Sequence, residues 1–166
     1  QADLATTSDQ VTDSMSAMGV GIDDLQGYLD VIVTTNNKAN TTAADLMDAF
    51  IGCGGAARAA GMNYKETSTA LGILANNGIK GSEAGTALNS MLVRISTKDV
   101  AQKAFKDLGV AVYDSSGEMR NMRDILVDLN GAMAGMTQEQ KNSYMSAIAG
   151  TNYYSQFGYL LDGVKE

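Results

Sequence analysis

The chain has 166 residues and a formal net charge of −7, and it contains no proline, histidine or tryptophan. A chain of this length can bury a sizeable core, and 45% hydrophobic with 19% charged residues does not suit intrinsic disorder. The missing histidine excludes His-based zinc sites and Ser-His or Cys-His catalysis, and the negative charge disfavours nonspecific binding to nucleic acid or anionic membrane.

Neither the one cysteine nor any apolar run points to a special environment. Cys53 cannot form an intrachain disulfide and has no histidine to act as its base, so we interpret it as a buried small hydrophobe. No apolar run approaches the roughly 20 residues that a membrane span needs. Because Gln1 is not a translation start, we expect residues 1–166 to be a single helical domain within a longer protein.

Apolar periodicity between glycines and capping residues predicts about eight or nine helices joined by short turns that contain glycine. The expected helices cover residues 8–19, 21–40, 40–61, 63–78, 81–96, 97–109, 122–133, 137–150 and 151–163. The expected N-caps are Ser8, Thr42, Asn63, Ser82 and Thr97, and helical periodicity returns after Thr137 and after Thr151. The fold class that follows is all-α, a compact multi-helix bundle.

Apolar residues three or four positions apart identify the faces expected to be buried. They are Ile22, Leu25, Leu29 and Ile32 in one helix, Leu46, Phe50 and Ile51 in the next, then Leu71 and Leu74, then Leu88, Met91, Leu92 and Ile95, and last Val100, Ala104, Phe105 and Leu108. The ten methionines fall mostly on such faces. Core filling explains them, and an adaptable groove for a partner is the alternative.

Only one segment departs from helical periodicity. Val110 to Tyr113 alternates apolar and small residues, and a turn follows from Asp114 to Gly117. This pattern predicts one small β-hairpin near residues 110–120.

The stretch GIKGSEAGTALNSML, residues 78–92, places three glycines and a lysine before an apolar helical pattern. A phosphate loop needs its lysine after the second glycine and a strand before the first, and neither condition holds. Spacing of Gly78 and Gly81 matches the backbone clamp of a KH domain, but no sheet or basic surface accompanies it. We interpret Gly78, Gly81, Gly85 and Leu88 as a structural helix-turn-helix motif in which Gly85 and Gly72 of the preceding helix allow close contact.

Other candidate sites are weaker. Residues 114–124 begin like a calcium loop but have Met119 at the obligatory glycine position. Carboxylate pairs, Asp45 with Asp48 and Asp124 with Asp128, are typical of a solvated helix face. We therefore expect no catalytic, cofactor or metal site. The aromatic residues near the C-terminus belong either to the core or to a partner surface: Tyr153, Tyr154, Phe157 and Tyr159.

Residues 70–88, ALGILANNGIKGSEAGTAL, and residues 108–117, LGVAVYDSSG, carry long patterns that contain glycine at several positions. These two stretches resemble, without gaps, the core region of phage tail tape measure proteins. The similarity extends over about residues 20–150, although Cys53 and Gly54 stand where this family often has a larger residue and a proline.

The resemblance implies a structural and assembly protein of a tailed phage or prophage, whose full chain sets tail length and templates the tail tube. Its implied partners are tail-tube, tail-tip or tail-assembly chaperone proteins, with possible self-association. It implies a place in the virion tail lumen, and in the host cytoplasm during assembly. We expect this piece to be a folded interaction domain without enzymatic activity. The alternatives are a peptidoglycan hydrolase domain using Glu66 and Asp124, and a bacterial helical interaction domain unrelated to phage.

Overall fold

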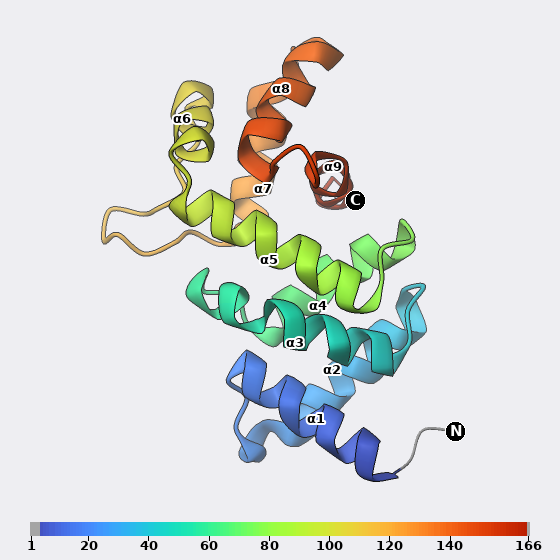
Figure 1. Ribbon diagram of the computed structural model, residues 1–166. Coiled ribbons are helices and arrows are strands. Elements are labelled where there is room, and N and C mark those ends of the chain that lie inside the picture. The colour runs from blue at the N-terminus through green and yellow to red at the C-terminus, as the bar shows by residue number, and fades with distance from the viewer. Residues whose placement is uncertain (1–3, 166) are drawn as a thin grey trace. The chain divides into compact units, whose positions relative to one another are not determined.

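Helices account for most of residues 4–165, the part of the chain that the computed structural model describes (Figure 1). Over this part there are nine α-helices and one 3-10 turn, so the all-α prediction is confirmed. Their bounds are α1 (Leu4–Met18), η1 (Ile22–Asp24), α2 (Leu25–Lys38), α3 (Ala43–Ala59), α4 (Tyr64–Asn76), α5 (Gly81–Thr97), α6 (Asp99–Leu108), α7 (Met122–Met133), α8 (Gln138–Ala149) and α9 (Tyr154–Gly163).

Two compact units divide the chain, and their boundary falls inside α5. The first unit extends to Asn89, and the second begins at Ser90. Residues 81–89 of α5 belong to the first unit, and residues 90–97 belong to the second. The expectation of a single domain over residues 1–166 stays a prediction.

Helices α3, α4 and α8 each begin at a side-chain cap, and the sequence predicted two of these caps, Thr42 and Asn63. The Thr42 hydroxyl accepts a hydrogen bond from the Asp45 backbone N–H at 3.1 Å. Asn63 and Glu66 form a reciprocal capping box at the start of α4, where each side chain accepts from the other residue's backbone N–H. Thr137 begins α8 in the same way. These caps satisfy N–H groups that have no partner within the helix.

Three predicted N-caps are wrong: Ser8, Ser82 and Thr97. Helices α1 and α5 begin before the first two of these residues. Thr97 is the last residue of α5, and its hydroxyl donates to the Val93 carbonyl at 2.6 Å. A hydroxyl inside a helix can bond the carbonyl one turn back, so its presence in the sequence does not by itself mark a helix start.

Helices α1, α3, α4 and α6 end with the same pair of backbone hydrogen bonds. In α4, the Gly78 N–H donates to Ala75 and the Ile79 N–H donates to Leu74, both at 3.0 Å. This is a Schellman motif, in which a glycine in the left-handed region ends the helix, and Gly78 has φ +88°. The residue after the glycine is apolar in all four helices: Val20, Met62, Ile79 and Val110.

The first unit depends on very close approach of α3 to α1. A Cβ placed on Gly54 of α3 would lie 2.6 Å from the backbone carbonyl of Ala17 in α1, much closer than real side chains approach. Gly54 is therefore required for the two helices to touch through their backbones. Beside it, Cys53 and Ala57 are fully buried.

An aromatic cluster of three rings completes the core of the first unit. Tyr28 of α2 is fully buried, with its ring centroid 5.9 Å from that of Phe50 and 5.8 Å from that of Tyr64. Its hydroxyl donates to the Ser14 hydroxyl, which donates in turn to the Val11 carbonyl. Burial raises the pKa of the Tyr28 phenol above its ordinary value, so the ring remains neutral in the core.

Some residues of the predicted apolar faces lie at the surface. Ile22 is 75% exposed because it belongs to η1 rather than to α2, and Val100 at the start of α6 is 52% exposed. Ile51 is also exposed. Most other members of the predicted faces are buried or half-buried. The two buried residues of α2 are Ile32 and Tyr28. The predicted apolar face included Ile32 but not Tyr28.

In the second unit, a guanidinium group binds the carbonyl groups at the C-terminal end of α8. Arg94 of α5 donates to the carbonyls of Ala147 and Ile148, at 3.0 and 3.3 Å. These carbonyls belong to the last turn of α8, where a positive charge also interacts favourably with the helix dipole. Gly150 follows with φ +87°, and a Cβ there would lie 3.2 Å from the Arg94 Nε. Glycine therefore leaves room for the cation at this helix end.

The predicted β-hairpin at residues 110–120 is wrong. Residues 4–165 contain no strand, and only an isolated bridge joins Tyr113 to Met119. The two arms are too short to build a ladder, and no third strand pairs with them within the described residues. Val110 and Val112 are instead buried among helices, each 7% exposed. The alternating pattern therefore identified the buried residues, Val110 and Val112, but the segment is not a strand.

Candidate functional site

The candidate site from the sequence begins with the turn between α4 and α5. Gly78 and Gly81 both have positive φ, +88° and +58°. L-residues with a side chain rarely adopt this conformation, so the four-residue connection depends on both glycines. Gly81 is buried, and a Cβ on it would lie 3.3 Å from the Asp45 carboxylate. The lysine within the turn, Lys80, is half-buried.

Gly85 contacts a different helix from the one expected. A Cβ on Gly85 would lie 2.6 Å from the Ala49 carbonyl oxygen of α3, and Gly52 of α3 faces the Gly85 backbone in return. The predicted pairing of Gly85 with Gly72 is wrong, because Gly72 faces Thr35 and Ala39 instead. The glycine stretch therefore places the beginning of α5 directly on α3.

Leu88 completes this motif as a core residue. It lies one turn after Gly85 in α5 and is 1% exposed. The turn glycines, the contact glycine and Leu88 thus fix backbone geometry and packing. No side chain among these four residues can donate a hydrogen bond, accept one or bind a metal.

The aromatic residues near the C-terminus do not share one environment. Phe157 is 1% exposed and packs in the core of the second unit. Tyr153 and Tyr159 are half-buried, and Tyr154 at the start of α9 is 38% exposed. Of the four residues, Tyr154 offers the largest exposed fraction for a contact with another chain.

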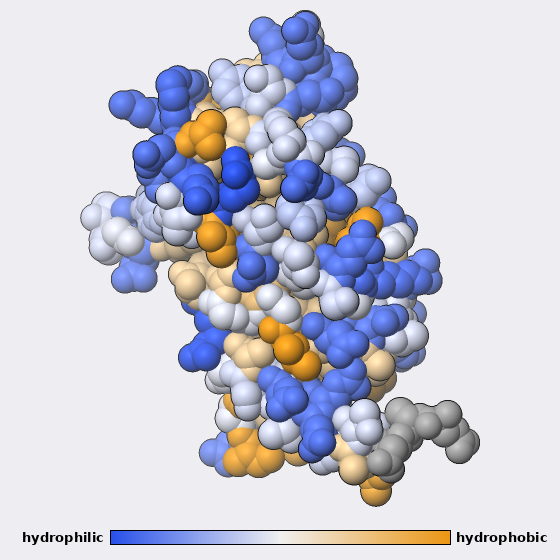
Figure 2. Space-filling model, viewed as in Figure 1, coloured by the Kyte–Doolittle hydropathy of each residue, from blue (hydrophilic) through white to orange (hydrophobic). Residues whose placement is uncertain are grey.

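Exposed apolar side chains are dispersed rather than gathered. On the face drawn in Figure 2 they form small separate spots among polar residues. The large apolar residues that are most exposed in the described part are Leu4, Ile22, Val33, Ile51, Val93, Val100, Tyr113, Val127 and Tyr154. Scattered residues of this kind are normal at a protein surface.

A groove of about 420 Å³ lies between α7, α8 and α9 of the second unit. Met133 and Leu161 are almost fully buried in it, and Met145 is half-buried. Lys141 and Lys165 carry its positive charge, and Lys165 forms an ion pair with Asp162 at 2.9 Å. Methionines in a groove can adjust to different apolar partners, and the partner-groove interpretation of the methionines stays a prediction.

Three carboxylates that the sequence offered as candidate catalytic or calcium-binding groups accept hydrogen bonds from backbone N–H groups or form an ion pair. Glu66 accepts from the Asn63 backbone N–H in the capping box, and Asp114 accepts from two N–H groups of its own turn. Asp128 pairs with Arg120 at 2.7 Å.

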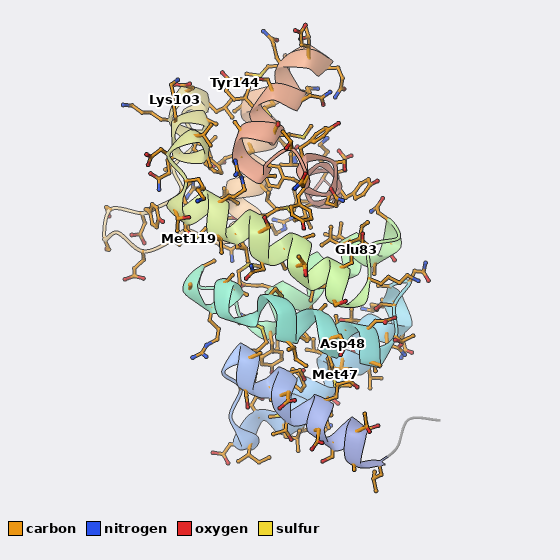
Figure 3. All side chains as sticks on the ribbon, in the orientation of Figure 1. Met47, Asp48, Glu83, Lys103, Met119 and Tyr144 are labelled. Carbon is orange, nitrogen blue, oxygen red and sulfur yellow. The ribbon has the colours of Figure 1, made fainter. Side chains whose placement is uncertain are left out.

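The remaining carboxylates lie on helix surfaces. Asp48 accepts from the Gln10 side chain at 2.7 Å and lies on the exposed side of α3 (Figure 3). Asp124 is exposed in the first turn of α7. Among residues 4–165, no three Asp, Glu or Cys side chains lie close enough together to hold a metal ion.

Cys53 is fully buried in α3. Burial raises the pKa of its thiol from 9.0 to about 12. The thiolate is the nucleophilic form, so this environment suppresses reactivity.

No helix in the described part of the chain is long and apolar enough to cross a membrane.

Comparison with known proteins places these features in a family. The family described as phage-related minor tail protein matches residues 1–150. The tape measure protein of Pneumococcus phage Dp-1 is 33% identical over 165 residues, covering 99% of this chain and 14% of that protein. The probable tape measure protein of Escherichia phage P2 is 30% identical over 149 residues, covering 88% of this chain and 18% of that protein. No solved structure matches.

Replacing Gly85 with alanine tests the contact between α5 and α3. The new Cβ would meet the Ala49 carbonyl oxygen at 2.6 Å, and we expect the overpacking to lower the free energy of unfolding by ~1–3 kcal/mol. Urea unfolding with a common slope measures this difference.

The matched control is Gly55→Ala in α3, where a Cβ would meet no atom within 4 Å. Alanine is favoured over glycine inside a helix by roughly 0.5–1 kcal/mol, so this variant should be slightly stabilised. A Gly85→Ala protein as stable as the Gly55→Ala protein would contradict the proposed contact.

The second prediction concerns Cys53. Because a pKa of about 12 instead of 9.0 lowers the thiolate fraction about a thousandfold at neutral pH, a disulfide reagent should label the folded chain far more slowly than the chain in urea. Because the pKa is raised in the folded chain, the buried thiol lowers the free energy of unfolding as the pH rises from 9.0 toward 12. Below pH 9.0 the thiol is protonated in both the folded and the unfolded chain, so it has no such effect. Equal labelling rates in the folded and unfolded chains would show that the thiol is accessible.

Proposed function

The chain belongs to the phage-related minor tail protein family, as a region of the tape measure type, and we propose that it is a folded helical interaction module rather than part of a length-setting rod. The matched region makes up 14% and 18% of the two curated relatives. On this proposal, the measurement of tail length belongs to other parts of the full protein.

The length of the helices is the observation that carries this proposal. The longest, α3 and α5, have 17 residues each, which is about 26 Å at 1.5 Å per residue. A continuous helix of 166 residues would extend about 250 Å. Schellman glycines and side-chain caps interrupt the chain instead, and close glycine contacts such as that of Gly54 with Ala17 pack its helices on one another.

The partner contacts that we propose lie on the second unit. Tyr154 is exposed at the start of α9, and the groove between α7, α8 and α9 presents Met145 beside Lys141. Tyrosine is enriched in interfaces because it offers a large rigid contact with a polar tip. Tail-tube, tail-tip and tail-assembly chaperone proteins are the proposed partners, with self-association as a further possibility. Assembly in the host cytoplasm and a final place in the tail lumen would follow.

We propose no enzymatic role. Glu66, one carboxylate of the hydrolase alternative, is already used in the α4 capping box. The other, Asp124, is exposed to solvent in the first turn of α7.

Small-angle scattering tests whether the chain is a folded module. We expect a radius of gyration far below that of a single 250 Å helix, because the helices end after at most 17 residues. A value that matches the continuous rod would overturn the proposal.

Replacing Tyr154 with serine tests the partner surface. We expect binding to the tail-tube or tail-tip protein encoded with this chain to weaken about tenfold, since aromatic interface residues often contribute more than 1 kcal/mol. Calorimetry with the purified proteins measures the dissociation constant.

The control is Tyr113→Ser, which removes a tyrosine of similar exposure, 41% against 38%, from the α6–α7 connection. Circular dichroism should show equal helicity for both variants. If Tyr113→Ser weakens binding as much as Tyr154→Ser, or if neither variant changes it, the proposed surface is wrong.

A further inference from the structure

Two Asn-Gly pairs occur in the sequence, Asn77–Gly78 and Asn130–Gly131. In such a pair the backbone nitrogen of the glycine can attack the asparagine side-chain carbonyl, because no glycine side chain hinders the approach. The chain therefore contains the same reactive dipeptide in two different structural settings.

Asn77 lies at the exposed C-terminal end of α4. Its side-chain amide donates to the Ile73 carbonyl at 2.9 Å, and the Gly78 N–H donates to Ala75 at 3.0 Å. Both contacts are local to the last turn of the helix. Helix ends open with a much smaller free energy than core elements do, and Gly78 has the backbone freedom of a residue without Cβ.

Asn130 is held by a contact distant in sequence. It lies within α7 and is half-buried, and its side-chain amide donates to the Leu161 carbonyl of α9 at 2.7 Å. Asn130 and Gly131 lie in the last turn of α7, so this turn must open before the side chain can reach the Gly131 nitrogen. The hydrogen bond to Leu161 of α9 must break as well, so the opening disrupts tertiary packing in addition to fraying one turn.

From this contrast we propose that Asn77 is a site of spontaneous deamidation in the folded protein and that Asn130 is protected. The Gly78 backbone nitrogen loses its proton and bonds to the Asn77 side-chain carbonyl carbon. The bond from that carbon to the side-chain nitrogen breaks, and ammonia leaves with the proton. Water then opens the cyclic imide at either carbonyl, which gives aspartate or isoaspartate at position 77.

Modification at this position changes the connection on which α5 depends. A new carboxylate at the C-terminal end of α4 interacts unfavourably with the helix dipole. Isoaspartate also adds a main-chain atom to the short turn that ends at Gly81, before the close contact of Gly85 with α3. The reaction therefore loosens the packing of α5 on α3 as the protein ages. This inference is independent of the proposed function.

Peptide mapping by mass spectrometry tests the order of the two reactions. The folded chain is incubated at mildly alkaline pH, and the conversion of Asn77 and of Asn130 is followed over time, with a parallel incubation in urea. We expect Asn77 to react several-fold faster than Asn130 in the folded chain, with both aspartate and isoaspartate as products. In urea the two rates should become similar, because the dipeptides are the same.

Asn77→Gln and Asn130→Gln are the matched variants, since glutamine keeps the amide but reacts slowly through a larger ring. Asn77→Gln should abolish the early acidic form that ion exchange separates from the folded chain, and Asn130→Gln should leave it unchanged. Thermal unfolding of the separated acidic form should occur at a lower temperature than that of the unmodified chain.

Three results would overturn the proposal. Asn130 could react as fast as Asn77 in the folded chain, Asn77 could stay intact while the unfolded chain reacts, or position 77 could yield aspartate without isoaspartate. An acidic form with an unchanged melting temperature would overturn the inferred effect on α5.

Discussion

Backbone contact between helices through glycine is the constraint on which the first unit depends. Gly54 lets α3 touch the Ala17 backbone of α1, and Gly85 lets α5 touch the Ala49 backbone of α3. Helices that approach this closely leave little space between them for large side chains. The core is therefore built at the sides of these contacts, by residues such as Tyr28 and Phe50. Because α3 takes part in both contacts, its row of small residues determines where its neighbours can lie.

Features that depend on local physics could be predicted from the sequence. A glycine followed by an apolar residue ends four helices because the Schellman hydrogen bonds involve only neighbouring residues, as at Gly78 and Ile79. The capping box of Asn63 and Glu66 was predictable for the same reason. The number of helices and most of the buried faces followed from these signals and from apolar periodicity.

Features that depend on tertiary contacts could not be predicted in this way. The partner of Gly85 is Ala49 of α3 and not Gly72, because the sequence shows that a glycine permits contact but not which helix provides it. Threonine is a residue type that often caps helices, yet the Thr97 hydroxyl donates to the Val93 carbonyl within α5. The segment around Val112 alternates like a strand because one side faces a helical core. Asn130 is bonded to Leu161, and no local signal in the sequence indicates that pairing.

The two units differ in how their aromatic residues are buried. In the first unit, the buried Tyr28 ring contacts the buried Phe50 ring and the half-buried Tyr64 ring. In the second unit, Phe157 is buried while Tyr154 is exposed at the same helix. A buried tyrosine needs a partner for its hydroxyl, whereas an exposed one leaves both ring and hydroxyl available to another chain. The aromatic residues of the first unit thus stabilise that unit. The partner contacts that we propose lie on the second unit.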